Sequence, residues 1–177
     1  MTPYTILLTP LRSDLKRRIA EQEAEARLLG EGLGHLPSGQ PVWQGEGSLE
    51  LSLSHSDHWL AVAFAPKGMR VGIDIEEKED QAARLLPRYA SKEERETLDR
   101  LGLPPIYLWC GKEAVYKAHS DRLSAGLSQI LLVDRDLFEV EDDEGVVFRQ
   151  PITYIEGDGW VMAHTLTGRS VPIRLAE

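Results

Sequence analysis

The chain is organised around nine consecutive residues, Trp109-Cys110-Gly111-Lys112-Glu113-Ala114-Val115-Tyr116-Lys117. Successive side chains of a helix are about 100° apart, so Trp109, Glu113 and Lys117 follow one another along one stripe. Neighbouring apolar side chains such as Leu108 turn toward a core. Taken alone, the stripe is most simply an exposed Glu-to-Lys pair, which adds a few tenths of a kcal/mol to a helix. A functional interpretation therefore depends on a second acidic stretch upstream.

That second stretch is Gly72-Ile73-Asp74-Ile75-Glu76. Side chains of a strand alternate between two faces, so the isoleucines point into a core while Asp74, Glu76 and Gly72 point the other way. Two carboxylates at positions i and i+2 are adjacent oxygen ligands, and Gly72 leaves room for a ligand to approach the backbone. An ordinary exposed strand face explains the same pair equally well.

Considered together, Asp74, Glu76 and Glu113 offer carboxylates from a strand and a helix, which are the oxygen ligands that Mg²⁺ prefers. Lys112 and Lys117 flank the helical carboxylate, and Ser54-His55 ends an alternating strand. Pyrophosphate chemistry requires a metal that bridges two phosphates and a lysine that neutralises charge or protonates the leaving oxygen. The sequence therefore predicts a Mg²⁺ site next to a phosphate site.

Composition bounds the class of protein. The chain has 177 residues, enough for one core or for two small lobes that share an interface. Its net charge of −9 argues against a nucleic-acid binder held by phosphate contacts. We expect a cytoplasmic protein, because there is no apolar run of membrane-spanning length and no signal-peptide order at the N-terminus. Cys110 is the only cysteine, which excludes internal disulfides, and we expect it to be a small buried hydrophobe.

Hydrophobic periodicity predicts alternating strands and helices along the chain. Thr9-Pro10 has the pattern of a helix start. Five carboxylates at residues 139–144 precede Gly145 and are most simply a solvated hairpin loop. The predicted strands cover residues 4–8, 49–55, 59–65 and 70–76, the predicted helices cover 11–29, 80–89, 91–101 and 106–119, the segment 30–47 is a loop, and an antiparallel meander covers 130–175.

In their order and spacing these motifs resemble those of the 4'-phosphopantetheinyl transferases. The matching pieces are Ser54-His55-Ser56, residues 72–76 and residues 109–117, supported by Arg88-Tyr89-Ala90-Ser91 and Gly126-Leu127-Ser128. The likeness runs from about Leu49 to Val133 and is closest to the surfactin-synthetase-activating, pseudo-dimeric type.

The resemblance implies an α+β fold of two similar α/β-sandwich lobes in one chain, each a small, mostly antiparallel sheet with helices. The implied N-terminal lobe covers residues 1–66 and contacts coenzyme A. The implied C-terminal lobe covers residues 67–177 and carries the metal site and the motif helix. Coenzyme A would lie in the cleft between them.

The implied activity is that of a holo-[acyl-carrier-protein] synthase, in which 4'-phosphopantetheine moves from coenzyme A to a serine of an apo acyl or peptidyl carrier protein and 3',5'-ADP leaves. Glu113 would help to deprotonate the serine, and Lys117 would protonate the departing 3',5'-ADP. The other roles that the resemblance implies are Mg²⁺ or Mn²⁺ ligands at Asp74, Glu76 and Glu113, coenzyme A contacts at Arg27, Ser54, His55, Asp74, Lys112 and Lys117, and carrier-protein docking at Arg88 and Arg122.

The chain departs from the family pattern at Gly39-Gln40-Pro41, where family members often have Gly-Lys-Pro. Glutamine cannot neutralise a phosphate, so this position lacks one cation of the coenzyme A site. Two alternatives stay open, a Mg²⁺-dependent phosphohydrolase or nuclease and a non-catalytic coenzyme A-binding homologue. The acidic net charge weighs against a nuclease, and the filled acidic and lysine positions weigh against a lost activity. We expect a monomer without nucleic-acid or membrane partners, acting in fatty acid, polyketide or nonribosomal peptide synthesis.

Overall fold

The computed structural model describes residues 4–37, 40–45, 47, 49–167 and 171–176, so Gly39 of the Gly39-Gln40-Pro41 segment lies outside the described residues. The helices are α1 Arg17–Leu29, α2 Glu79–Tyr89, α3 Lys92–Leu101 and α4 Pro105–His119, with short 3-10 turns η1 Gly30–Gly32, η2 Ser120–Arg122 and η3 Gly126–Gln129. The strands are β1 Thr5–Pro10, β2 Leu33–His35, β3 Pro41–Trp43, β4 Leu49–His55, β5 Trp59–Pro66, β6 Ile73–Glu76, β7 Ile130–Asp134, β8 Leu137–Glu141, β9 Val147–Pro151, β10 Thr153–Gly157, β11 Trp160–His164 and β12 Ile173–Leu175.

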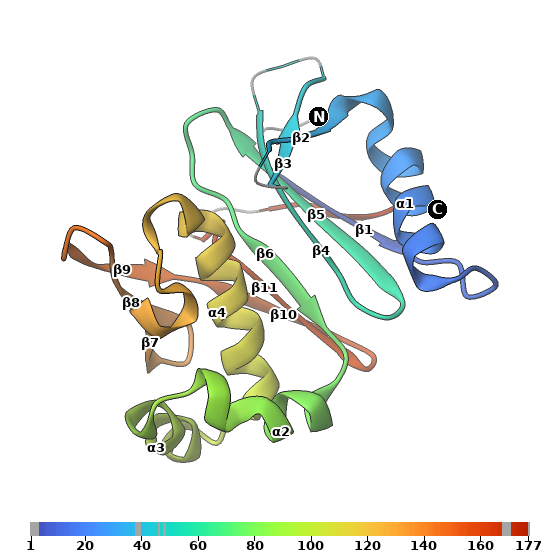
Figure 1. Cartoon of the computed structure of the whole chain (residues 1–177). Helices are drawn as coiled ribbons and strands as arrows, with labels where there is room; N and C mark the ends of the chain where they lie inside the picture. Colours follow the sequence, from blue (N-terminus) through green and yellow to red (C-terminus); the bar gives the residue numbers. More distant parts are fainter. Residues whose placement is uncertain (1–3, 38–39, 46, 48, 168–170, 177) are drawn as a thin grey trace.

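The elements form layers, in which two sheets lie face to face between α1 on one side and α4 on the other (Figure 1). Helix α1 packs on one face of the sheet β12-β1-β5-β4, and the other face of that sheet packs on the sheet β10-β11-β6. Helix α4 covers the far face of the second sheet, together with α2, α3 and the sheet β7-β8-β9. These small, mostly antiparallel sheets with helices confirm the α+β prediction.

The first helix begins later than predicted. Strand β1 continues through Thr9 and Pro10, which pair with Leu60 and Trp59 of β5. The backbone N–H of Leu11 then donates to the carbonyl of His58 at 2.7 Å. The proline therefore ends a strand, and α1 starts only at Arg17. The prediction of a helix from residue 11 is wrong because the Thr-Pro pattern suits both strand ends and helix starts.

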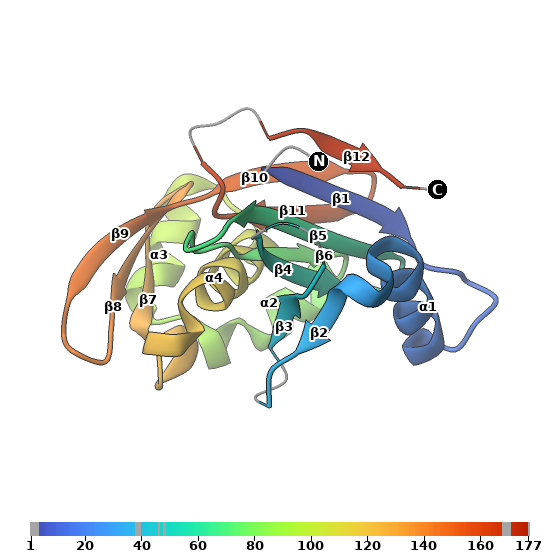
Figure 2. The same ribbon diagram turned by 90° about the horizontal axis from the view of Figure 1, so that it is seen from above.

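The predicted C-terminal meander is divided among three sheets. Strands β7, β8 and β9 form one sheet, whereas β10 and β11 pair with β6. Strand β12 runs parallel to β1, with Ile173 opposite Ile6, and Figure 2 shows it beside β1 at the edge of the first sheet. The last strand thus joins the sheet built from the start of the chain, while the division into lobes at residue 66 stays a prediction.

Helix α4 crosses β6 at very close range beside Gly72. A Cβ atom on Gly72 would lie 1.9 Å from the carbonyl oxygen of Ala114. The missing side chain therefore makes room for the helix backbone, and the interpretation of Gly72 as space for a ligand is wrong. This close packing brings the polar stripe of α4 against the acidic face of β6.

In the described part of the chain, no helix has both the length and the apolar character needed to cross a membrane.

The buried imidazole of His164 makes stability dependent on pH. Burial lowers the pKa of His164 from 6.5 to about 4. Below pH 6.5 the imidazole takes up a proton in the unfolded chain but stays neutral in the folded chain. The contribution of the neutral imidazole to the free energy of unfolding is therefore complete above pH 6.5 and is lost as the pH falls toward 4. Between pH 7 and pH 5, we expect the free energy of unfolding of the wild type to fall by about 2 kcal/mol more than that of His164→Phe.

Urea denaturation at the two pH values measures this difference. Because other titrating groups are common to both proteins, they cancel in the comparison. If the free energy of unfolding falls equally in the wild type and in the variant, His164 takes up its proton in the folded state as readily as in the unfolded state.

Candidate active site

Asp74 lies at the centre of the candidate site, on β6, and its side chain is almost fully buried. Its Oδ1 accepts hydrogen bonds from Ser54 Oγ and from Lys117 Nζ, both at 2.7 Å. Lys117 Nζ also donates to the carbonyl of Ile73 at 3.2 Å. One carboxylate thus joins strand β4 of the first sheet, strand β6 of the second and helix α4.

Glu76 lies two residues further along the same face of β6. Its Oε1 accepts a hydrogen bond of 2.9 Å from Nε1 of Trp109, one end of the stripe on α4. Beneath this face, the thiol of Cys110 is buried and donates to the carbonyl of Asp74 at 3.2 Å, and burial raises its pKa. The thiol is therefore a packing group, as expected, and is not an activated nucleophile.

Glu113 completes the acidic group from the middle of the stripe. Burial, and secondly the charge of Asp74, raises the pKa of Glu113, and the same two causes raise the pKa of Glu76 to about 7. Lys117 lowers both values in part. The three carboxylates are therefore held close enough to repel one another, with one ammonium group among them.

This donor set fits a divalent cation on chemical grounds. Oδ2 of Asp74 is buried and has no hydrogen-bond partner among the described residues. A Mg²⁺ ion would take such oxygen ligands and would relieve the repulsion that raises the two glutamate pKa values. Within the residues that the structure describes, however, no three His, Cys, Asp or Glu side chains converge closely enough to hold a metal ion as they now lie.

The side chains of His55 on β4 and Arg27 on α1, both predicted to contact phosphate, lie against other groups of the protein. Nε2 of His55 lies 2.9 Å from Oε1 of Glu25 on α1. The exposed guanidinium of Arg27 donates to Oγ1 of Thr9 at 2.9 Å and to the carbonyl of Pro10 at 3.2 Å. Sequence patterns do not indicate that Glu25 lies beside His55, because a helix and a distant strand end share no pattern.

Lys112 lies away from the acidic group, although it is next to Glu113 in sequence. Its side chain is 1% exposed, and its ammonium donates to the carbonyl of Tyr89 at 2.8 Å and to Glu94 at 2.9 Å. The other oxygen of Glu94 accepts from the backbone N–H of Leu132 at 3.1 Å. This buried pair joins α2, α3, α4 and β7, so Lys112 is placed to hold helices together.

Lys112→Met is expected to lower the free energy of unfolding by about 3–5 kcal/mol, because it leaves the Glu94 carboxylate buried without its counter-charge. Urea denaturation measures the loss. Lys92→Met is the matched control, since Lys92 is 78% exposed in a surface pair, and its change is expected to stay within about 0.5 kcal/mol. An unaffected stability in Lys112→Met would show that the buried pair with Glu94 does not stabilise the fold.

The two arginines predicted to dock a carrier protein differ in their surroundings. Arg88 is exposed and lines a cavity of about 670 Å³. Arg122 is half-buried in an ion pair with Asp142, and its guanidinium lies 5.3 Å from the ring centroid of Phe148. Arg88 is therefore accessible at the surface, whereas Arg122 is held by internal contacts.

Two cavities adjoin the stripe on α4. The first, about 670 Å³, is bordered by Trp109 and is lined mostly by apolar side chains of α2, the η3 region and β7. The second, about 480 Å³, lies between β4 and the end of α4 and is bordered by Gln40 and Lys117. Glu113 lies between Trp109 and Lys117 on the same helix face, although none of the three carboxylates is among the residues that line either cavity.

The fold and the site define an α+β protein of several small sheets, with a group of carboxylates where the first two of these sheets meet the central helix α4. Residues 70–159 match the 4'-phosphopantetheinyl transferase superfamily, and this stretch contains Asp74, Glu76, Glu113 and Lys117. The match covers just over half of the chain, and the chain belongs to this superfamily of transferases. Comparison with individual curated proteins gives no match.

Proposed function

We propose that the protein transfers 4'-phosphopantetheine from coenzyme A to a serine hydroxyl of an apo acyl or peptidyl carrier protein, as a monomeric enzyme of the surfactin-synthetase-activating, pseudo-dimeric type. The observation that carries the proposal is the buried carboxylate of Asp74, which accepts hydrogen bonds from Ser54 and Lys117. Asp74 and Lys117 lie within the matched residues 70–159. Glu76 and Glu113 surround it with further carboxylates whose pKa values are raised.

The two cavities support a single extended ligand across the acidic group. The first has the size and the apolar lining for the pantetheine arm, next to Trp109. The second, with Lys117 and Gln40 on its border, would receive the nucleotide part. The pyrophosphate between these two parts of coenzyme A would then lie at Asp74, Glu76 and Glu113.

In the proposed reaction, the serine oxygen of the carrier attacks the phosphorus next to the pantetheine arm. The bond from that phosphorus to the bridging oxygen breaks, and 3',5'-ADP leaves. Glu113 would accept the serine proton, and a raised pKa makes its carboxylate a stronger base than an exposed glutamate. Lys117 would give a proton to the departing oxygen.

Asp74, Glu76 and Glu113 are the residues that would hold a Mg²⁺ or Mn²⁺ ion. When bound, the ion neutralises charge on the pyrophosphate. Ser54, His55 and Arg27 are proposed to contact the phosphates from the first lobe. Arg88, at the outer edge of the first cavity, is proposed to meet the acidic carrier protein.

The proposal is tested by intact-mass spectrometry of a panel of apo carrier proteins incubated with the protein, coenzyme A and Mg²⁺. A phosphopantetheine adduct is expected on at least one carrier and should be absent from a chelated control. Hydrolysis of coenzyme A without any adduct would overturn the transferase in favour of a phosphohydrolase. Binding without reaction would favour a non-catalytic homologue.

Lys117→Ala is expected to lower kcat by about 100-fold with KM for coenzyme A within about threefold, because a proton donor acts on the leaving group in the transition state. Initial rates of adduct formation at varied coenzyme A measure both constants. The melting temperature must be checked as well, since Lys117 is also a partner of the buried Asp74. Equal losses in kcat/KM and in the affinity for coenzyme A would show that Lys117 binds a phosphate and does not donate the proton.

A further inference from the structure

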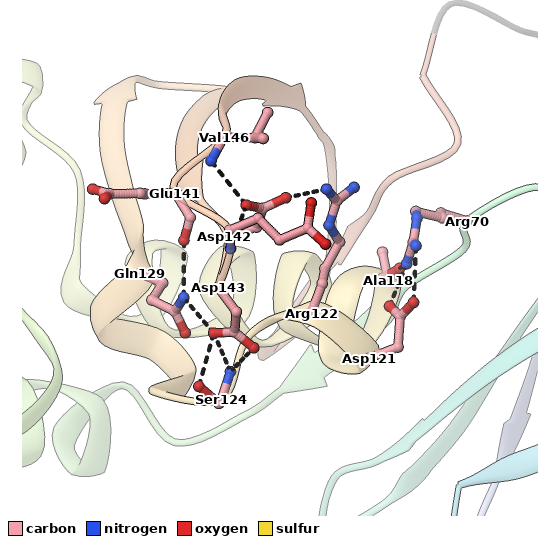
Figure 3. Close-up of polar contacts among 11 residues, drawn as sticks. Arg70, Ala118, Asp121, Arg122, Ser124, Gln129, Glu141, Asp142, Asp143 and Val146 are labelled. Atoms are coloured by element: carbon pink, nitrogen blue, oxygen red, sulfur yellow. Dashed lines mark hydrogen bonds and ion pairs between the residues drawn. The ribbon is translucent and has the colours of Figure 1, made fainter.

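The acidic turn between β8 and β9 is fastened to the segment that follows α4 (Figure 3). The Asp142 side chain is 1% exposed, and its Oδ1 accepts from the backbone N–H of Val146 at 2.9 Å. Its other oxygen pairs with Arg122. The backbone adds a further link, because the N–H of Asp143 donates to the carbonyl of Arg122 at 3.0 Å. These contacts fix the start of segment 122–129.

Asp143 holds the rest of that segment. Its Oδ1 accepts from Oγ of Ser124 at 2.8 Å, from the backbone N–H of Ser124 at 2.9 Å and from Nε2 of Gln129 at 3.0 Å. The side-chain oxygen Oε1 of Gln129 in turn accepts a hydrogen bond of 2.8 Å from the backbone N–H of Ala125. Two carboxylates thus provide most of the side-chain contacts that shape this loop.

The other side of the loop is held from the start of the second lobe. Arg70 forms a two-pronged ion pair with Asp121, with Nη2 to Oδ2 at 2.9 Å, and donates to the carbonyl of Ala118 at 3.2 Å. Figure 3 shows this pair and the acidic turn on opposite sides of the end of α4. The segment is therefore restrained from both directions.

The restrained loop forms a wall of the first cavity. Ala125, Leu127 and Ser128 line the same 670 Å³ space as Trp109 and Leu85. Because the acidic turn itself lies outside that lining, its effect on the cavity must pass through the loop. Sequence alone had suggested a solvated hairpin turn here, yet Asp142 is buried and both aspartates bind the loop.

We propose that Asp142 and Asp143 are positioning residues for the pantetheine arm of coenzyme A, acting through the loop at residues 122–129. The inference rests on the proposed function, because it takes the first cavity as the site of that arm. It predicts a defect in recognition of the arm without a defect in recognition of the nucleotide or in the chemical step.

The restraint itself is tested by hydrogen exchange on the whole protein. In Asp143→Ala, amides of residues 123–129 are expected to exchange at least about tenfold faster, while those of α4 keep their rates. Glu144→Gln is the matched control, since it removes a carboxylate from the same turn without touching the loop, and its rates should equal those of the wild type. Unchanged exchange in Asp143→Ala would overturn the inference.

The positioning role is tested with two ligands. Asp143→Ala is expected to raise KM for coenzyme A about tenfold with kcat within about twofold, because ordering the loop must then be supplied by binding. The inhibition constant of 3',5'-ADP, which lacks the arm, should not change. Asp143→Asn keeps an acceptor for Ser124 and should fall between the wild type and Asp143→Ala. An equal shift for both ligands, or no shift for either, would refute the role.

The same design separates this inference from the proposed function. If the wild type modifies no carrier protein, the proposed transferase fails, and calorimetric binding of coenzyme A and 3',5'-ADP to wild type and variant decides the positioning role. A wild type that binds no coenzyme A would refute both.

Discussion

Glu113→Gln is expected to lower the rate of phosphopantetheine transfer by about 1,000-fold or more. The substitution keeps the volume of the side chain but removes both a ligand charge and a proton acceptor. Folding should be spared, because the charge that is removed is one that burial and Asp74 already disfavour. Rates of adduct formation by intact mass, together with a urea denaturation curve, measure the two effects.

Glu96→Gln is the matched control for this experiment, since it removes an exposed carboxylate of α3. Its rate and its stability should equal those of the wild type. Full activity in Glu113→Gln would remove Glu113 from the mechanism. A fall in stability that parallels the fall in rate would assign the effect to folding.

Gly72→Ala is expected to lower the free energy of unfolding by about 3 kcal/mol or more, the upper range for overpacking of a core. The new Cβ would meet the carbonyl oxygen of Ala114 at 1.9 Å, and a helix backbone cannot give way as a flexible side chain can. Any molecules that fold must displace α4, which carries Glu113 and Lys117 away from Asp74. Transfer activity should therefore be lost together with stability.

Gly68→Ala separates this steric effect from the general cost of replacing a glycine. Gly68 has a φ of +81°, but a Cβ there would meet nothing within 4 Å. The free energy of unfolding of Gly68→Ala is expected to fall by about 1 kcal/mol, from backbone strain alone. Similar losses in the two variants, measured by urea denaturation, would show that α4 can move away from Gly72 at little cost.

Local patterns in the sequence predicted the central elements of the fold well. The capping box at Ser91 and Glu94 opens α3 as expected, and the motif helix runs from Pro105 to His119, close to the predicted span. Pairing between distant segments was harder to predict. Strands β10 and β12 have similar alternating patterns, and nothing in those patterns shows that one pairs with β11 and the other with β1.

Only part of the candidate site could be predicted, because local patterns show the face that a side chain occupies but not its distant partner. Helical and strand periods placed Asp74 and Lys117 on facing surfaces, and the two side chains do meet. The same reasoning grouped Lys112 with Lys117. Periodicity shows which face a lysine occupies, but the partner that buries Lys112 is Glu94, on a different helix, and a single helix pattern cannot reveal it.

Strand β12 has a consequence for how the two sheets can move. The chain passes from the first sheet to the second between β5 and β6, and it returns between β11 and β12. Because the chain links these two packed sheets twice, both crossings limit how far one sheet can slide over the other. They therefore help to keep Ser54 of β4 beside Asp74 of β6, to whose carboxylate its hydroxyl donates.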